Sequence, residues 1–266
     1  MWISSRIRSD SHTLTEAPFR VFQLNESNIR ITDVKERDFV ISVRALNESE
    51  SEAMQLHQVH HVINTLLIAL NVASFGSFYW YDDPWVHPVH TIADDFAGTN
   101  TRIQAMIVSS DTSHDELKAI DEQEIYNTIL IFGIVAREDT NVLVGEYCRG
   151  LLLLRMNFYD LNFRKEAFLC FYRALEHFVA VRILGVKRLK NELNDLMKGL
   201  KQLGASQVSV NELREVYSIR CSQIAHSQGV QREITKDEVL KTKVFLDYVM
   251  HKTFKQQANE IISSRT

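Results

Sequence analysis

The stretch VYSIRCSQIAHSQG, residues Val216–Gly229, lies near the end of a long series of segments with helical periodicity. Working outward from it, apolar residues recur at helical spacing and predict helices over 114–137, 141–160, 163–184, 187–203, 208–226 and 235–258. No proline follows Pro88, so nothing in these segments breaks a helix. The sequence therefore predicts an all-α helical bundle over residues 114–266.

Several of these predicted helices also carry end signals. Gly185 and Gly204 stand where helix C-termini are expected, because glycine readily adopts the left-handed conformation of a C-terminal cap. Thr235 followed by Glu238 forms a capping box at the start of the last helix.

The first part of the chain has a different pattern. Residues 1–17 show no clear period and are expected to form a loose terminus. Short runs rich in β-branched and aromatic residues predict strands at Phe19–Leu24, Asn28–Val34, Phe39–Ala45, Val72–Tyr81, Trp85–Ile92 and Arg102–Val108. Between the third and fourth runs, Asn47 and Glu50 cap a predicted helix with an apolar stripe formed by Val59, Val62, Ile63, Leu66, Leu67 and Leu70. We predict a small α+β domain over residues 1–110 and an α+β fold class overall.

Composition narrows the classes of protein to consider. The chain has 266 residues, an apolar fraction of 45%, and no apolar segment of signal-peptide or membrane-spanning length. Its three cysteines show no metal-type spacing, and an odd count argues against a disulfide framework, so we expect a reducing, cytoplasmic location.

The net charge of −4 hides an asymmetry between the two parts of the chain. Residues 1–150 carry 11 basic and 22 acidic residues, a net −11, whereas residues 151–266 carry 19 and 12, a net +7. A basic C-terminal part can face a polyanion such as RNA. Alternatively, the two parts attract each other or a second subunit.

Arg220 and His226 are the leading candidates for chemistry. Arginine is permanently charged and suits a phosphate, and histidine titrates near neutrality and can transfer a proton. Together they suffice for metal-free RNA cleavage, in which the 2′-hydroxyl attacks its own phosphate. On a continuous helix their side chains would diverge by about 120° and lie roughly 9 Å apart along the axis. They can share a site only if the helix ends between them or if a second copy of the chain supplies partners. The structural alternative is that Arg220 pairs with an acidic side chain and His226 caps the helix.

The sequence offers three weaker candidates. His57 and His61 are helical i, i+4 neighbours that could bind a metal, with further ligands from His60, His87, His90, Asp94 and Asp95. We favour the other interpretation, a polar flank of an amphipathic helix with scattered loop histidines, because such spacings recur by chance. The aromatic run Phe75–Trp85 could bind a ligand but is more typical of a core strand.

The basic piece Val186–Lys201 could contact phosphates through Lys187, Arg188, Lys190, Lys198 and Lys201. Because Glu192 and Asp195 interrupt it, we interpret this piece as a solvated face unless it lies beside Arg220.

The motif YSIRCSQIAHSQG, between two amphipathic helical segments, resembles the signature of the HEPN superfamily (higher eukaryotes and prokaryotes nucleotide-binding), in which an arginine is followed after four to six residues by a histidine. The upstream segment FYRALEHFVAVRIL, which includes Glu176, is similar to the long helix common in these domains. The resemblance covers roughly residues 114–258. It implies a helical bundle that forms a homodimer, with both copies of Arg220 and His226 in one cleft.

The resemblance further implies a metal-independent endoribonuclease that acts on single-stranded RNA without a cofactor. Arg220 would orient or stabilise the scissile phosphate, and His226 would act as general acid or base. Many such proteins serve in antiviral defence or toxin–antitoxin systems, so an antitoxin or defence component is an expected protein partner. A second hypothesis is a non-catalytic HEPN-like binding or assembly module. A third is a metal enzyme that uses His57, His61 and His87.

Overall fold

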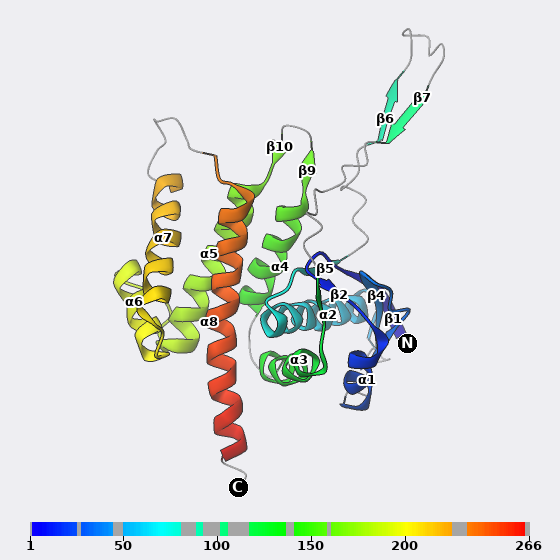
Figure 1. Ribbon diagram of the computed structural model, residues 1–266, viewed down its shortest axis with the longest axis horizontal. Helices are drawn as coiled ribbons and strands as arrows, with labels where there is room; N and C mark the ends of the chain where they lie inside the picture. Colours follow the sequence, from blue (N-terminus) through cyan, green and yellow to red (C-terminus); the bar gives the residue numbers. More distant parts are fainter. Residues whose placement is uncertain are drawn as a thin grey trace.

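The computed structural model describes residues 2–25, 28–44, 50–80, 89–92, 102–105, 117–136, 141–158, 161–224 and 233–263. Within these ranges the fold is mixed α+β, as predicted, with a small antiparallel sheet near the N-terminus and helices dominating the rest (Figure 1).

The sheet contains four strands among the described residues, in the order β3-β4-β1-β5. These strands are β1 (Trp2–Ser9), β3 (Ile29–Thr32), β4 (Asp38–Arg44) and β5 (Phe78–Trp80), and each neighbouring pair is antiparallel. Side chains alternate along β4, so Phe39, Ile41 and Val43 are buried on one face. The predicted strands at 28–34 and 39–45 are confirmed.

Two predictions for the N-terminal part are wrong. Residues 1–17 do not form a loose terminus, because β1 is an inner strand that pairs with both β4 and β5. Its serines and arginines hide the strand signal, and pairing on both sides outweighs this weak propensity. The predicted strand Phe19–Leu24 is instead the helix α1 (Glu16–Asn25). Phe19 and Phe22 are both buried, and their i, i+3 spacing puts them on one helix face.

The predicted long helix is α2 (Glu52–Ser74), which begins at Ser51, whose hydroxyl accepts a hydrogen bond from the Met54 amide. The expected cap, Asn47, lies outside the described residues. The strand predicted from Val72 begins later, because α2 continues to Ser74. The Asn71 side chain binds both backbone groups of Phe78 at the start of β5. Its amide donates to the Phe78 carbonyl at 2.9 Å, and its oxygen accepts from the Phe78 amide at 3.0 Å.

Short strand pairs complete the first half. The strands β6 (Val89–Ile92) and β7 (Arg102–Ala105) pair antiparallel, which confirms strand structure in the described parts of two predicted segments. The strand β2 (His12–Thr13) pairs in parallel with β8 (Lys118–Ala119). The helix predicted over 114–137 is therefore wrong at its start. It begins as α3 (Glu122–Val135), where Asp121 and Glu124 form a capping box.

The remaining helices follow the sequence pattern with shifted ends. They are α4 (Asn141–Arg155), α5 (Arg164–Phe178) with its π-helical continuation η2 (Val179–Ile183), α6 (Glu192–Gln202), α7 (Gln207–Ile224) and α8 (Lys236–Ser263). The helix predicted over 141–160 ends early, because β9 (Asn157–Phe158) and β10 (Leu161–Asn162) form a short hairpin.

The expected end signals are present. Gly185 and Gly204 both have positive φ angles, +65° and +62°. The capping box of α8 forms between Thr235 and Glu238, with the Thr235 amide donating to the carboxylate at 3.0 Å and the Glu238 amide donating to the hydroxyl at 3.2 Å.

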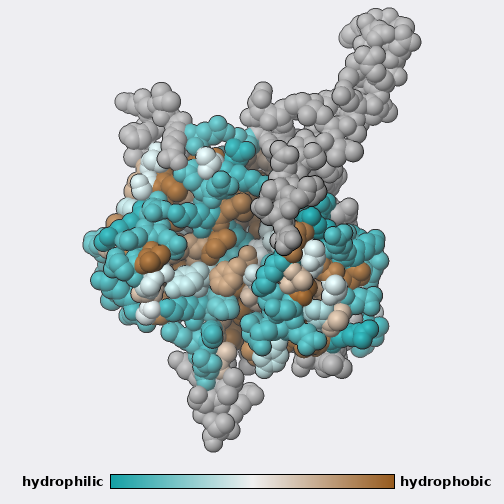
Figure 2. Space-filling view, in the orientation of Figure 1, coloured by the Kyte–Doolittle hydropathy of each residue, from teal (hydrophilic) through white to brown (hydrophobic). Residues whose placement is uncertain are grey.

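Helix α5 is buried along most of its length and packs against α4 and α8, while α6 and α7 lie on the outer side of α5 (Figure 1). In Figure 2 the hydrophobic side chains of this face form separate patches among polar ones, some of them over the middle of the molecule. A continuous cluster of buried apolar residues extends from the sheet through α2 to α8. The division into domains 1–110 and 114–266 stays a prediction.

Among the helices that the structure describes, none is both long and apolar enough to cross a membrane.

Candidate functional site

Arg220 lies on α7 and connects three helices. Its Nη2 atom is 2.8 Å from Oε2 of Glu192, at the start of α6. The other oxygen of the same carboxylate, Oε1, accepts a 2.6 Å hydrogen bond from the hydroxyl of Tyr172 on α5. Both oxygens of Glu192 are thus engaged, one by each neighbouring helix. The prediction that Arg220 pairs with an acidic side chain is confirmed.

The Arg220 guanidinium is held but not enclosed. Its carbon Cζ lies 5.9 Å from the ring centroid of Tyr172 and 6.0 Å from that of Tyr217, near the outer limit of a cation–π contact. The Arg220 side chain keeps 26% of its surface exposed, and that of Glu192 keeps 21%. A partly buried pair that still reaches water can exchange partners, and it contributes less to stability than a fully buried pair would.

A pocket of about 520 Å³ opens beside this pair. This volume lies within the roughly 300–1,000 Å³ that is typical of small-ligand sites. The cations that line it, among the described residues, are Arg173, Lys187, Arg188, Lys190 and Arg220, and the other polar lining residues are Glu176, His177 and Glu192. Positive charge therefore exceeds negative charge around the pocket, which favours an anionic ligand.

The loop between η2 and α6 brings the basic piece to Arg220. We interpreted this piece as a solvated face unless it lay beside Arg220, and Lys187, Arg188 and Lys190 line the same pocket as Arg220. The predicted helix over 187–203 begins only at Glu192, so these three residues lie on an irregular loop. The condition for a functional role is thus met for this part of the predicted basic piece.

Glu176 is a second acidic group of the pocket. Burial and the neighbouring charge of Glu192 raise its pKa to about 6, while Arg220 and two other arginines oppose the rise. A carboxyl with this pKa changes protonation close to neutral pH, so the pocket contains a group that can bind or release a proton. Burial and the bond to Glu192 likewise raise the pKa of the Tyr172 hydroxyl, which keeps it a hydrogen-bond donor.

His226 lies outside the described residues, which end on α7 at Ile224. The structure therefore does not test whether Arg220 and His226 share a site, or whether the helix ends between them. Both statements stay predictions.

Three of the histidines considered as metal ligands lie together on α2. His57 and His60 are exposed on α2, where the His60 ring meets Trp80 edge-on at 5.4 Å, and His61 is half-buried. His87 and the pair Asp94 and Asp95 lie outside the described residues, so the metal hypothesis stays untested. Within the described ranges, no three His, Cys, Asp or Glu residues gather closely enough to hold a metal ion.

The aromatic run is divided in the structure: Phe75 is an exposed cap residue at the end of α2, whereas the strand that follows packs on the core. Phe78 and Tyr79 are buried in β5, and the guanidinium of Arg155 lies 3.3 Å from the Tyr79 ring centroid. The indole of Trp80 donates a 2.8 Å hydrogen bond to Asn64. The core-strand interpretation is confirmed for residues 78–80, and residues 81–85 lie outside the described residues.

Sequence reasoning missed Tyr172, Arg173 and Glu192 as parts of the site. The first two lie on α5, where the pairs Tyr172 with Glu176 and Arg173 with His177 have the i, i+4 spacing of neighbours on one helix edge. That spacing was a usable signal. Glu192 was interpreted as an interruption of the basic piece, although it is the partner of Arg220.

No protein-family model, curated protein or solved structure matches this chain.

Proposed function

We propose that the chain is a HEPN-type, metal-independent endoribonuclease that acts as a homodimer, with residues 114–266 as its helical domain. The observation that supports the proposal is that Arg220 lines one pocket together with Lys187, Arg188 and Lys190. Clustered cations beside a partly exposed arginine suit an RNA backbone, because phosphate contacts need only positive charge and hydrogen-bond donors. The three free cysteines support a reducing, cytoplasmic setting.

In this proposal Arg220 leaves Glu192 and binds the scissile phosphate. The 2′-oxygen attacks the phosphorus and gives its proton to a base, while the P–O5′ bond breaks and the leaving oxygen takes a proton from an acid. The His226 side chains of the two copies fill these two roles. The products are a 2′,3′-cyclic phosphate and a 5′-hydroxyl. The basic pocket counters the negative charge that develops on the phosphate.

The test is cleavage of single-stranded RNA by the purified chain in EDTA. We expect 2′,3′-cyclic phosphate ends, and a loss of at least roughly 100-fold in rate for Arg220→Ala and for His226→Ala. Arg214→Ala is a matched control, because Arg214 is an exposed arginine on the same helix and lies outside the pocket. Equal cleavage by all three variants would refute the assignment.

A second candidate function is a non-catalytic HEPN-like binding or assembly module. The bonded set Tyr172, Glu192 and Arg220 favours it, because this set ties α5, α6 and α7 together. In that case wild type and variants lack nuclease activity, and Arg220→Ala or His226→Ala substantially lowers the melting temperature. A nuclease-free protein with unchanged variant melting temperatures would contradict this second function.

A further inference from the structure

A second hollow lies on the other side of the basic loop. It has a volume of about 780 Å³ and is lined by Leu184, Val186, Lys187, Arg188, Leu189, Lys190, Asp195 and Lys198. Four of these residues, at positions 187–190, also line the Arg220 pocket. The two hollows therefore flank one loop and share its side chains, and the basic surface continues from Arg220 on α7 to Lys198 on α6.

Hydrogen bonds fix the backbone of this loop at both ends. At its start the Val186 amide donates to the Ala180 carbonyl at 2.8 Å, just after the positive-φ turn at Gly185. At its end the amides of Lys190 and Asn191 donate to one oxygen of Asp195, at 2.8 and 2.9 Å. Fixed backbone at both ends presents the loop side chains in a defined arrangement, which lowers the entropy cost of binding.

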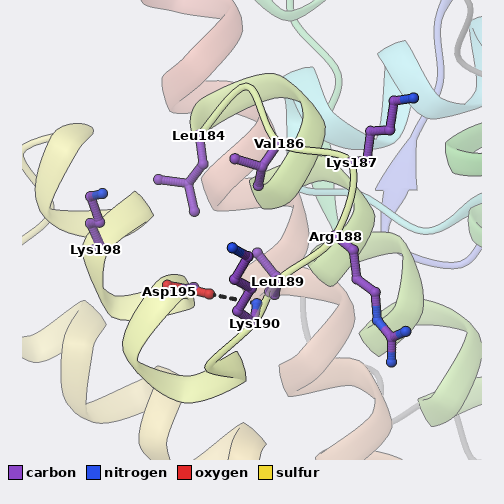
Figure 3. Close-up of a pocket in the computed structure, with 8 residues that line it drawn as sticks. All are labelled: Leu184, Val186, Lys187, Arg188, Leu189, Lys190, Asp195 and Lys198. Carbon is purple, nitrogen blue, oxygen red and sulfur yellow. Dashed lines mark hydrogen bonds between the residues drawn. The ribbon is translucent and has the colours of Figure 1, made fainter.

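The second hollow combines an apolar floor with flanking cations. Figure 3 shows Leu184 and Val186 projecting into the space, Lys190 and Lys198 beside it, and Arg188 directed to the other side of the loop. Lys187, Arg188, Lys190 and Lys198 are exposed, and none of them forms a salt bridge with a residue that the structure describes. Asp195 lies near Lys190 and Lys198 and offsets part of their charge, but the four cations outnumber this one carboxylate in the lining of the hollow.

An apolar floor between cations matches the chemistry of single-stranded nucleic acid. Lysines contact the phosphates, and the aliphatic side chains of Leu184, Val186 and Leu189 can cover the face of an unpaired base by van der Waals contact. A simple inorganic anion would not use the apolar floor. A track that leads away from the proposed cleavage pocket fits the nucleotides that flank a scissile phosphate.

We propose that this second hollow, the flank groove, binds the nucleotides next to the scissile phosphate, with Lys190 and Lys198 contacting their backbone. The inference rests on the proposed ribonuclease function, because it takes the Arg220 pocket as the position of the cleaved bond. It makes the preferred substrate longer than a dinucleotide. It also assigns a role in binding, but not in the chemical step, to Lys198.

The experiment measures binding of a fluorescent 2′-O-methyl RNA of about 12 nucleotides to the full-length chain by anisotropy, across a range of salt. The 2′-O-methyl groups prevent cleavage. The groove variant carries Lys198→Gln, because Lys198 lines the second hollow and not the Arg220 pocket. Its matched control carries Lys236→Gln, which removes one exposed lysine from α8, outside both hollows. A dinucleotide probe reports on the Arg220 pocket alone.

The groove variant is expected to bind the longer probe about fivefold more weakly than the control at about 0.1 M salt, since each lost phosphate contact changes the salt slope by about 0.7. Its slope of log K against log salt should be shallower by about 0.7, and dinucleotide binding should not change. Equal binding of the long probe by the groove variant and the control overturns the flank groove while leaving the ribonuclease proposal in place.

The two proposals can fail separately. If wild type binds the long probe through the groove but cleaves no RNA, the flank groove stands and the ribonuclease function fails. If wild type binds no RNA and instead binds vesicles containing about one-third anionic lipid, with the groove variant weakened, the basic surface serves a membrane and the RNA inference is overturned.

Discussion

Two clusters in this protein each combine a tyrosine, a carboxylate and a cation, but they differ in how deeply they are buried. In each, a tyrosine hydroxyl donates a 2.6 Å hydrogen bond to a carboxylate that also pairs with a cation. The first is Tyr172, Glu192 and Arg220, with the charged pair 26% and 21% exposed. The second is Tyr147, Asp247 and Lys243, whose charged pair is 2% and 0% exposed, with Lys243 Nζ 2.6 Å from Asp247. We call them the open cluster and the buried cluster.

The two clusters differ in whether their cation can reach a ligand. Lys243 in the buried cluster also donates to the Asn71 side chain and the Gly76 carbonyl, so it ties α8 to the end of α2, and every partner is internal. The cation of the open cluster faces a pocket with surplus positive charge. The buried cluster has all its partners inside the protein and no access for a ligand, whereas a partly exposed cation can exchange its partner for one.

The largest expected effect is at the buried cluster. Lys243→Met removes the cation that pairs with the Asp247 carboxylate and donates to the Asn71 side chain and the Gly76 carbonyl. The free energy of unfolding at neutral pH should therefore fall by about 3–5 kcal/mol. Denaturant-induced unfolding followed by circular dichroism measures it. Lys241→Met, on the exposed side of the same helix, is the matched control and should cost less than about 1 kcal/mol. Similar losses for the two variants would contradict the difference between the clusters.

The buried cluster should also show in the pH dependence of stability. Burial raises the pKa of Asp247 to about 6, although the nearby charge of Lys243 acts in the opposite direction. The folded state therefore binds a proton that the unfolded state has already released, so this group's contribution to stability falls as pH rises from about 4 to about 6. Relative to Asp247→Asn, wild type should lose on the order of 2 kcal/mol across that window. Parallel stability curves for the two proteins would contradict the raised pKa.

A smaller effect is expected at the open cluster. Arg220→Ala removes an ion pair that water already screens, so the free energy of unfolding should change by only about 0.5–1 kcal/mol. Thermal and denaturant unfolding measure it, with Arg214→Ala as the control on the same helix. A loss as large as that of Lys243→Met would mean that both clusters are structural, and it would support the non-catalytic module.

Periodicity in the sequence predicted the α+β class and most of the helices. It failed where neighbours decide the structure. β1 carries serines and arginines at many positions, and only pairing with two strands makes it part of the sheet. α1 contains enough aromatic and β-branched residues to mimic a strand, and its helical spacing of Phe19 and Phe22 was the overlooked signal.

The sequence identified separate parts of the candidate site but not that they lie together. Arg220 and the basic piece each stood out, but more than thirty residues separate Lys187 from Arg220 along the chain, so only the packing of α5, α6 and α7 brings them together. Lys243 and Asp247 show the i, i+4 spacing of an ordinary surface pair. Their burial depends on α2 and α4, which local sequence does not reveal.

The central claim is that Arg220 exchanges Glu192 for an RNA phosphate, and a double-mutant cycle tests it most directly. The dissociation constant of a 2′-O-methyl RNA is measured for wild type, Glu192→Gln, Arg220→Ala and the double variant. Removing the competing charge should tighten binding about fivefold in Glu192→Gln, which corresponds to about 1 kcal/mol at a partly exposed site. That gain should largely disappear when Arg220 is alanine. An unchanged dissociation constant in Glu192→Gln, or the same gain with and without Arg220, would contradict the claim.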